Sequence, residues 1–435
     1  MADLKKILKL SPAPETELTY NQSVEYYTRY SNNAISENIK SEDKMLEIRV
    51  IKGKKMGIAS TNLLDKKNIL KTYDKAMQAL KAGKKDKSII PLTKKKKYNE
   101  NNHYNEKTAN YSPIDKANRL KEILSTTGDY KVSGLFTNGY SYYALANSNG
   151  VNCDYKSSSA SVSFTVQGQA GSSSWQGEAA NIDELDVKEI FNTAKKYAGL
   201  NKDAKDIKPG KYDVVLSPYA FEELIFFLLY YGLATLPYIE KRSAMNGKLG
   251  KKIASEKLTL YDNAFEPGAG GMPFDFEGTP RKKVMLINKG VLENFVHDRR
   301  TAKKMKTKNT GHSIGEPNTY GPIPMCPVFE GGKASPEEMI KSMKKGLYIR
   351  KLHYTNVLNP KELLVTGMTR DGVFMVENGE IKHAVKNLRF SDSLFNILSG
   401  IDMLGPVTAI DFDEGWGKIP WVKINGFNFT SKTEF

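Results

Sequence analysis

Apolar and polar side chains alternate in short runs along residues 23–60, a pattern typical of β-strands. The alternation over residues 23–60 breaks at Asn32-Asn33 and at Gly53, which are turn-forming residue types, so an antiparallel meander is predicted. Asp65 then precedes a helical pattern that ends near Gly83. These elements define an expected N-terminal domain over residues 1–83.

A second set of strands follows a poorly patterned stretch. Residues 84–113 are rich in Lys and Asn and show little periodicity, which predicts either a long surface excursion or a partly disordered linker. A helix is expected near 115–126 and another from Asp183 to about Ala198. Strands are expected at 130–137, 140–147, 150–168 and 172–180, with Val162, Phe164 and Val166 facing the core. Residues 114–207 therefore form an expected central α+β domain.

The remaining residues, 208–435, begin at the breaker Lys208-Pro209-Gly210. A buried strand at 213–216 leads into a helix-like apolar stretch that reaches Leu236. Further strands are expected near 283–288, 291–298, 346–354, 362–369 and 371–377, with helical patterns at only 336–344 and 392–400. Runs of strands with segregated helices indicate an α+β fold rather than a doubly wound parallel sheet.

Composition narrows the class of protein. A chain of 435 residues, with 40% hydrophobic and 26% charged residues, is long enough for two or three domains with cores of their own. Two cysteines, Cys153 and Cys326, are too few for a disulfide framework. The longest apolar run is about half of a membrane span, and Met1–Leu10 makes a poor signal peptide, so a cytoplasmic protein without membrane contact is expected.

The net charge of +16 favours anionic partners through long-range attraction. Much of it lies in two runs, Lys84–Lys97 and Arg299–Lys308. Neither run carries the interleaved aromatic residues of a nucleic-acid stacking platform, so a solvated basic surface is the preferred interpretation and nucleic acid is not an expected partner.

Motifs distributed along the whole chain resemble those of the TldD/PmbA family of peptidases, also called modulators of DNA gyrase. The N-terminal part contains Asn33-Ala34-Ile35-Ser36 and Gly57–Asn62, and the central part contains Ala146–Gly150 followed by a Ser-rich alternation. The most specific matches are Phe274–Pro280, Asp298, Thr301-Ala302-Lys303 and Thr310-Gly311-His312. The resemblance implies a C-terminal curved antiparallel sheet, barrel-like, around a central apolar helix.

The same resemblance places a zinc motif, HExxxH, on the apolar helix, but this chain lacks its chemistry. The two metal-binding histidine positions fall on Phe226 and Tyr231, and the general-base position falls on Phe227. Zinc requires imidazole, thiolate or carboxylate ligands, which these side chains do not offer. The third family ligand, a cysteine near the C-terminus, is absent from Gly405–Lys423. No catalytic residue and no metal ligand are therefore predicted for this chain.

Histidine and cysteine residues offer two other candidate chemical sites. Among five histidines, none has a second histidine at ligand spacing, and the nearest mixed metal site would join His312 to Asp275 or Glu277. A hydrogen-bonded structural histidine is the simpler interpretation. Cys326 lies in a proline-rich loop and is expected to be a buried, inert thiol.

The resemblance implies a PmbA or TldE type of chain, the non-catalytic subunit of a metallopeptidase that processes unfolded or extended peptides. Zinc would be held only by a TldD-type partner in a heterodimer, and a homodimer is also considered. A candidate peptide cleft is placed at the third group of motifs: Asp275, Glu277, Gly278, Thr310, Gly311 and His312. Turn and packing roles for these residues are an equal alternative. An autonomous peptidase with other chemistry and a nucleic-acid-associated protein stay open as other functions.

The helix itself yields one geometric expectation. Positions five apart on a regular helix are about 140° apart, so HExxxH ligands converge only on a distorted helix, such as one with a π-type bulge. A chain that has lost the ligands is expected to have lost this distortion, and Phe226, Phe227 and Tyr231 are expected to lie in the core.

Overall fold

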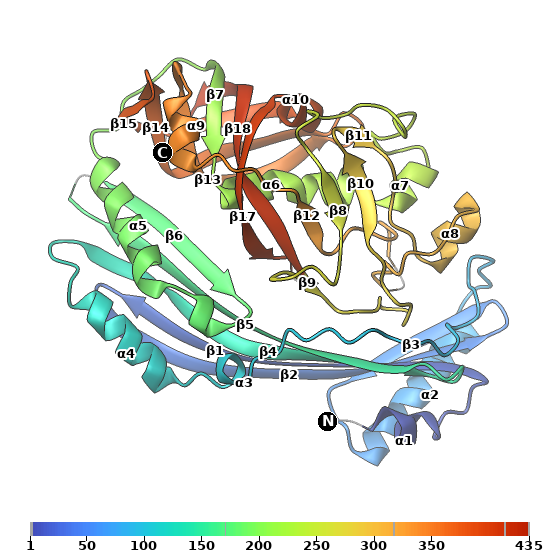
Figure 1. The fold of residues 1–435 in the computed structure, drawn as a ribbon. Coiled ribbons are helices and arrows are strands. Elements are labelled where there is room, and N and C mark those ends of the chain that lie inside the picture. Colours follow the sequence, from blue (N-terminus) through green and yellow to red (C-terminus); the bar gives the residue numbers. More distant parts are fainter. Residues whose placement is uncertain (1–2, 170, 316–317, 413–414, 434–435) are drawn as a thin grey trace.

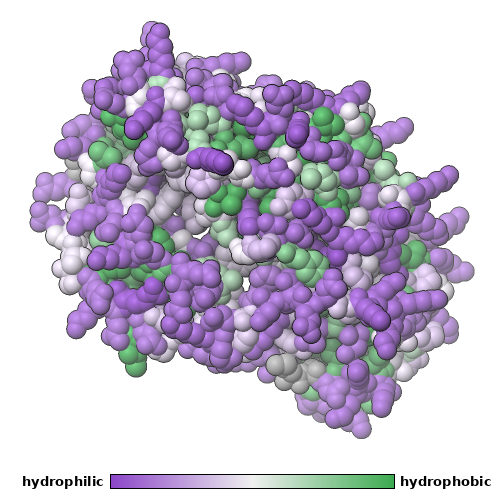
Figure 2. Space-filling model, in the orientation of Figure 1, coloured by the Kyte–Doolittle hydropathy of each residue, from purple (hydrophilic) through white to green (hydrophobic). Residues whose placement is uncertain are grey.

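Two β-sheets and the helices packed against them make up the protein (Figure 1). The computed structural model describes residues 3–169, 171–315, 318–412 and 415–433. The α+β class predicted from the sequence is confirmed. Figure 2 shows a mostly hydrophilic face with scattered apolar patches. None of the helices in the described ranges has the length and apolar character needed to cross a membrane.

The N-terminal sheet has six antiparallel strands in the order β3-β2-β1-β4-β5-β6. The expected meander is confirmed, and its outer strand β1 pairs with β4 from Glu17–Asn147 to Tyr30–Gly134. The expected N-terminal and central domains therefore share one sheet. Its strands are β1 (Glu15–Ser31), β2 (Ala34–Lys52), β3 (Lys55–Thr61), β4 (Lys131–Asn147), β5 (Asn152–Gln167) and β6 (Ser172–Ala179).

The two faces of this sheet differ in chemistry. Apolar side chains such as Val162 and Phe164, both fully buried, pack beneath the helices on one face. The alternate residues of the same strand, including Ser157 and Ser159, point to the opposite face, which is turned toward the C-terminal half. The covering elements are α1 (Leu4–Leu8), α2 (Lys66–Ala82), α3 (Glu106–Ala109), α4 (Pro113–Leu124), η1 (Ile182–Glu184) and α5 (Val187–Leu200).

Strand β4 runs unbroken through Asn138-Gly139, where two separate strands, 130–137 and 140–147, were expected. Gly139 faces β1 so closely that an added Cβ would lie 2.1 Å from the carbonyl oxygen of Val24. The glycine is therefore needed for close approach of two backbones and not for a turn.

The C-terminal half is a 12-stranded sheet curved around helix α6 (Pro218–Phe227). Most pairings are antiparallel as expected, but β7–β13 and β12–β18 pair in parallel. Its long strands are β7 (Gly210–Leu216), β13 (Lys345–Asn359), β14 (Leu364–Glu377), β15 (Glu380–Val385), β16 (Leu388–Ser393), β17 (Ile401–Asp411) and β18 (Gly415–Lys432). The shorter elements are α7 (Thr235–Ile239), β8 (Leu260–Asp262), β9 (Gly270–Gly271), β10 (Val284–Asn288), β11 (Val291–Leu292), α8 (Arg299–Met305), β12 (Pro327–Phe329), α9 (Pro336–Lys341) and α10 (Leu394–Ser399).

Residues 84–105 form an extended segment that we call the strap, because it crosses from one half of the molecule to the other. The Tyr98 hydroxyl donates to the carbonyl of Gly278 (2.8 Å), and the Asn101 amide donates to those of Ala264 and Gly271 (2.6 Å each). His103 Nε2 lies 2.6 Å from the Ala269 carbonyl. Two alternatives were expected for the linker, a surface excursion and a partly disordered segment. The strap corresponds to the surface excursion.

A buried arginine also joins the halves. Arg350 of β13 is 1% exposed and lies over the rings of Trp175 (4.4 Å) and Tyr197 (4.0 Å) from the central part. Its Nη1 donates to the Ser173 hydroxyl at 2.6 Å. Cation–π contacts of this kind are strongest where water is excluded.

Candidate functional site

Helix α6 begins with a side-chain N-cap at Ser217 and ends in a π-helical turn. The Ser217 hydroxyl accepts from the backbone N–H of Ala220 (3.2 Å), and Pro218 occupies the first helical turn, where its missing N–H costs nothing. Residues Leu228–Gly232 then form a π-helix, η2, in which Leu233 N donates to the Leu228 carbonyl at 2.8 Å. The expectation that the distortion is lost is wrong. The bulge that would let ligands five residues apart converge is still present.

Five aromatic rings on this turn and a neighbouring loop form what we call the aromatic shelf. Ring centroids are 4.5 Å apart for Phe226 and Tyr230, 6.2 Å for Phe227 and Tyr231, and 5.6 and 6.2 Å from Tyr320 to Tyr230 and Tyr231. Phe226 is 40% exposed and the other helix rings are half-buried. The expectation of a core position is therefore wrong for Phe226. The fully buried face of α6 is formed instead by Ala220, Phe221, Leu224 and Ile225.

The aromatic shelf does not fit a zinc ion. Its only heteroatoms are tyrosine hydroxyls, and the Tyr231 hydroxyl interacts with that of Tyr320; burial and this neighbour raise the pKa of Tyr231. In the described ranges, no group of three or more His, Cys, Asp or Glu side chains could hold a metal ion. Metal chemistry therefore has no donor set among the residues at this turn.

His312 belongs to a buried polar network centred on Asp262. Asp262 Oδ1 lies 2.6 Å from Arg281 Nη2 and 2.8 Å from His312 Nε2, and its Oδ2 accepts from the backbone N–H groups of Met325 and Cys326 (2.7 Å each). Burial disfavours the carboxylate, but Arg281, His312 and the backbone N–H of Cys326 together outweigh burial and hold the pKa of Asp262 well below its usual range. His312 is thus a structural histidine partnered by Asp262, and the mixed site with Asp275 or Glu277 is not formed.

Cys326 has the properties expected of an inert thiol. It is fully buried, and burial raises its pKa to about 12, although Arg281 Nη1, 3.2 Å from the sulfur, opposes this shift. A thiol with so high a pKa is a poor nucleophile at neutral pH.

The Phe274–Pro280 motif is a closed turn organised by Asp275. The Asp275 carboxylate accepts from the backbone N–H groups of Glu277 (3.0 Å), Thr279 (2.8 Å) and Ser313 (3.0 Å). Burial and the Glu277 carboxylate raise the pKa of Asp275 to about 7. Glu277 in turn pairs with Arg299 at 3.0 Å. These side chains stabilise the turn, as the packing alternative expected.

The six candidate cleft residues lie together but inside the protein. Asp275 and His312 are fully buried, Glu277 is 4% exposed, and Thr310 is half-buried. From this region, Phe276 lines the cavity that faces the N-terminal sheet, and Phe274 lines a second cavity beside the strap. Contact of the six residues with substrate stays a prediction. In the structure these residues form a layer behind Phe276.

Gly311 provides a test of this layer. Its φ of +74° is in the left-handed region, and an added Cβ would lie 2.4 Å from the carbonyl oxygen of Pro280. We expect Gly311→Ala to lower the free energy of unfolding by about 2–4 kcal/mol, because backbone strain and a backbone clash combine. Gly247→Ala is the control, since Gly247 has the same φ and open space around it. That change should cost about 1 kcal/mol. Equal losses in denaturant titrations would contradict the close packing of Gly311.

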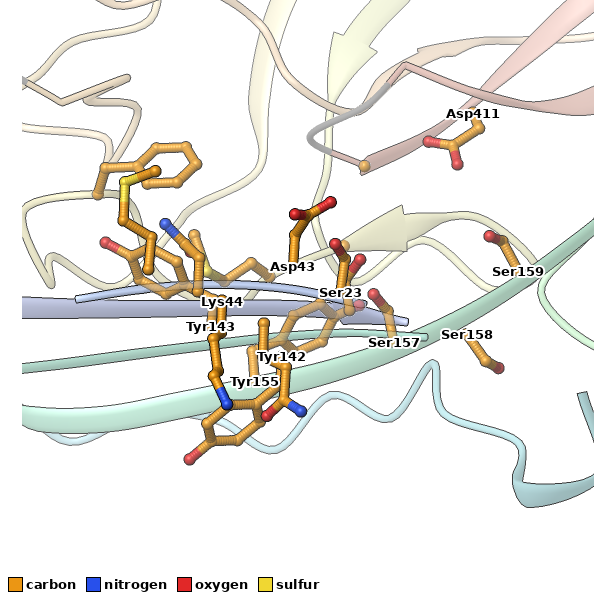
Figure 3. Close-up of a pocket in the computed structure, with 18 of the residues that line it drawn as sticks. Ser23, Asp43, Lys44, Tyr142, Tyr143, Tyr155, Ser157, Ser158, Ser159 and Asp411 are labelled. Atoms are coloured by element: carbon orange, nitrogen blue, oxygen red, sulfur yellow. The ribbon is translucent and has the colours of Figure 1, made fainter. Parts of the chain in front are cut away.

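A cavity of about 610 Å³ lies between the polar face of the N-terminal sheet and the C-terminal half. In Figure 3, Ser23, Asp43 and Ser157 come from the N-terminal sheet, and Asp411 of β17 lies across from them. The lining comprises Asn21, Gln22, Ser23, Asp43, Lys44, Met45, Asn62, Ser141, Tyr142, Tyr143, Tyr155, Ser157, Ser158, Ser159, Gly271, Met272, Phe276, Asp411, Gly415 and Trp416. Hydroxyls and carboxylates mixed with aromatic rings suit an extended peptide better than a purely apolar ligand.

The cavity and the aromatic shelf are joined by apolar contacts. Phe276, which lines the cavity, packs edge-on to Tyr143 at 5.2 Å. It also joins Tyr230 and Tyr320 around the buried residues Ala234, Ile323 and Met325. One aromatic surface therefore continues from the cavity wall to the π-helix.

The strap holds one wall of the cavity in position. The Tyr155 hydroxyl, on the cavity-lining strand β5, donates to His103 Nδ1 at 2.8 Å, while Nε2 faces the Ala269 carbonyl. Burial lowers the pKa of His103, so the neutral ring makes both contacts at neutral pH.

Sequence reasoning did not identify the cavity residues. Alternation along β1, β2 and β5 showed a polar face, and polar faces of antiparallel sheets usually contact solvent. Only the pairing of the two halves turns Ser23, Asp43 and Ser157 toward Asp411. The serine content of the 157–166 segment was the one available signal.

Comparison with known proteins agrees with this architecture. Residues 16–80, 106–201 and 209–431 match the PmbA/TldA metallopeptidase domain 1, central domain and C-terminal domain, respectively. A metalloprotease of Methanocaldococcus jannaschii is 28% identical over 201 residues, which span 46% of this chain and 44% of that protein. A metalloprotease TldD homologue of Buchnera aphidicola is 25% identical over 89% of this chain and 83% of its own. The crystal structure of TldE from Thermococcus kodakarensis superposes with a TM-score of 0.89 at 21% identity, over 99% of this chain and all of that one.

Proposed function

Because this chain belongs to the PmbA/TldD metallopeptidase family and carries aromatic rings at the positions where the resemblance places the metal ligands, we propose that it is the non-catalytic subunit of a peptidase. A zinc-bearing, TldD-type subunit would be its partner. The substrates would be unfolded or extended peptides. The observation that carries the proposal is the retained π-helix with Phe226, Phe227 and Tyr231 in place of HExxxH.

The retained geometry supports a binding role. A π-turn is rare and costs regular hydrogen bonding, so its survival without a metal indicates another use for the shape that it gives the helix. Here it presents the aromatic shelf next to the cavity. Aromatic rings can hold apolar side chains of a peptide, and the polar sheet face can hold its backbone.

Reconstitution with a family member that carries HExxxH, from the same source, tests the proposal. We expect this chain alone to hold no stoichiometric zinc by elemental analysis and to leave casein fragments intact. The mixture should form a complex on size-exclusion chromatography and cleave the fragments in a chelator-sensitive way. A complex whose partner has the motif glutamate changed to Gln should be inactive. One tightly bound zinc per chain, or cleavage by this chain alone, would overturn the proposal.

A further inference from the structure

Three lysine-rich segments, far apart in the sequence, meet at one end of the molecule. They are the β2–β3 turn (residues 52–55), residues 84–97 of the strap, and α8 with the residues after it (299–308). Lys54 Nζ donates to the Ile89 carbonyl (2.6 Å), Arg300 Nη1 donates to the Ser88 hydroxyl (3.4 Å), and Arg299 Nη1 donates to the Pro91 carbonyl (2.5 Å). We call these three segments together the basic surface. Figure 1 shows the turn, the strap and α8 side by side.

The basic surface contains nearly all of the excess charge of the protein. Its 28 residues include sixteen Lys and Arg and a single acidic residue, Asp86, for a net charge of +15. The other 407 residues therefore have a net charge of +1. A generally lysine-rich composition would spread the excess over the whole surface. Concentration in one place indicates an anionic partner.

The lysines of the basic surface are available to a partner. Thirteen of its fourteen lysines are exposed, and the other, Lys55, is half-buried. Figure 2 shows mostly hydrophilic side chains over the edge of the molecule where α8 lies. By contrast, both arginines make contacts inside the protein: Arg299 pairs with Glu277, and Arg300 contacts Ser88.

This composition favours carboxylates over nucleic acid. The three segments contain no Phe, Tyr or Trp on which a base could stack. Arginine, which binds guanine edges and phosphates with two hydrogen bonds, is already engaged. Lysine ammonium groups are point charges on flexible stems, so they accept carboxylates spaced irregularly along an extended chain.

The position of the basic surface relative to the cavity points to substrate. Hairpin β2–β3 has Lys52, Lys54 and Lys55 at its turn. The same hairpin and the residue after it contribute Asp43, Lys44, Met45 and Asn62 to the cavity lining. The strap likewise leads from the basic surface to His103, which holds the cavity residue Tyr155. Hairpin β2–β3 and the strap therefore both connect the basic surface to the cavity, and a polypeptide bound to the basic surface could follow either of them.

We propose that the basic surface binds acidic segments of extended polypeptides and so recruits Asp- and Glu-rich substrates to the cavity. The identification of the occupant as substrate rests on the proposed peptidase function. Recruitment by exposed charges acts over about 8 Å at physiological ionic strength and weakens as salt is added. It therefore selects substrates without fixing which bond is cut.

Fluorescence anisotropy on the full-length chain tests the proposal with labelled peptides of about 20 residues, one a Glu-Ser repeat and one a Lys-Ser repeat. We expect the acidic peptide to bind, the basic one not to bind, and affinity to fall as salt rises. The variants Lys84→Glu/Lys85→Glu/Lys87→Glu and Lys303→Glu/Lys304→Glu/Lys308→Glu should each weaken binding by about tenfold or more, since both segments contribute to one surface.

The control is Lys188→Glu/Lys202→Glu/Lys208→Glu, which makes the same change of net charge with exposed lysines on and after α5, at the other end of the molecule. Its affinity should stay within about twofold of the unmodified chain. Equal weakening by all three variants, no effect of the first two, or tighter binding of single-stranded DNA of equal charge would overturn the proposal. These measurements need neither zinc nor a partner, so failure of reconstituted cleavage would refute the peptidase function while leaving this binding result intact.

Discussion

Replacing Asp262 by asparagine should destabilise the C-terminal half by about 3–5 kcal/mol, the scale for breaking one side of a buried ion pair. The carboxylate is fully buried and accepts from Arg281, His312 and two backbone N–H groups. Asparagine keeps the volume but leaves the Arg281 charge without its counter-ion. The measurement is the free energy of unfolding from denaturant titration, followed by near-ultraviolet circular dichroism.

The matched control is Asp183→Asn, which breaks the ion pair between Asp183 and Lys107. Both side chains of that pair are 57% exposed, so the change should cost less than about 1 kcal/mol. A comparable loss at both positions would show that the Asp262 network is not a major source of stability.

The same network predicts the response to acid. Since the pKa of Asp262 is held below that of an unfolded-chain aspartate, about 3.9, ionised Asp262 stabilises the fold at all pH values above about 4. That contribution is lost as the pH falls further. Asp262→Asn should therefore flatten the loss of stability between about pH 4 and pH 2 relative to the unmodified chain.

Restoring the zinc motif by Phe226→His, Phe227→Glu and Tyr231→His should not produce a working metal site. The π-helix already gives the distortion that convergent ligands need, so geometry at this turn is not the obstacle. The obstacle is the third ligand, since Gly405–Lys423 contains no cysteine. We expect fewer than about one zinc per five chains after desalting, and no cleavage of casein fragments.

The triple variant should also lose about 2–4 kcal/mol of stability. Because Phe226 is 40% exposed and the other rings are half-buried, the new polar groups reach solvent, and the loss comes from ring packing and not from unsatisfied polar atoms. Leucine at all three positions is the control and should lose a similar amount, with no change in zinc content. A stable triple variant with one zinc per chain and peptide cleavage would show that the turn is still organised for catalysis.

Local patterns predicted much of the N-terminal half. The cap at Asp65 is present, with its side chain accepting from Asn68 N at 3.1 Å, and α2 ends at Ala82. Alternation also placed Val162, Phe164 and Val166 correctly in the core. These features depend on neighbours within a few residues, so they can be predicted directly from the sequence.

Features made by distant segments were not predictable in this way. Asn and Gly are turn-forming residue types, so Asn138-Gly139 suggested a break between two strands. Only the close approach of β1 explains why these two residues lie within β4. Strand β18 was missed, and its pairings with β7, β12 and β16 join segments that are separated along the chain. Strand β17 was missed with it, since β17 pairs with β18 alone among the described strands. The cavity likewise exists only once Asp43 and Asp411 face each other across the two halves.

The aromatic rings at the end of helix α6 show a different limit of prediction from sequence. The resemblance placed Phe226, Phe227 and Tyr231 at the metal-site positions of the family. Their apolar character predicted burial, and the absence of ligands predicted a regular helix. The backbone path set by Ser217 and Pro218 at one end and the π-turn at the other instead leaves Phe226 at the surface.

The pairing of β1 with β4 joins residues about 130 positions apart, such as Leu18 and Ala146, into one ladder. Dissection of the chain at residue 84 or 114 would leave β4 paired with β5 but separated from β1. The edge of β4 that pairs with β1 would then be open to intermolecular pairing, a known route to aggregation. Residues 1–207 should thus behave as one cooperative folding unit of high contact order, which nucleates slowly and can fold only after β4 has emerged from the ribosome. The first two family domains are, by this criterion, sequence modules and not autonomous folds.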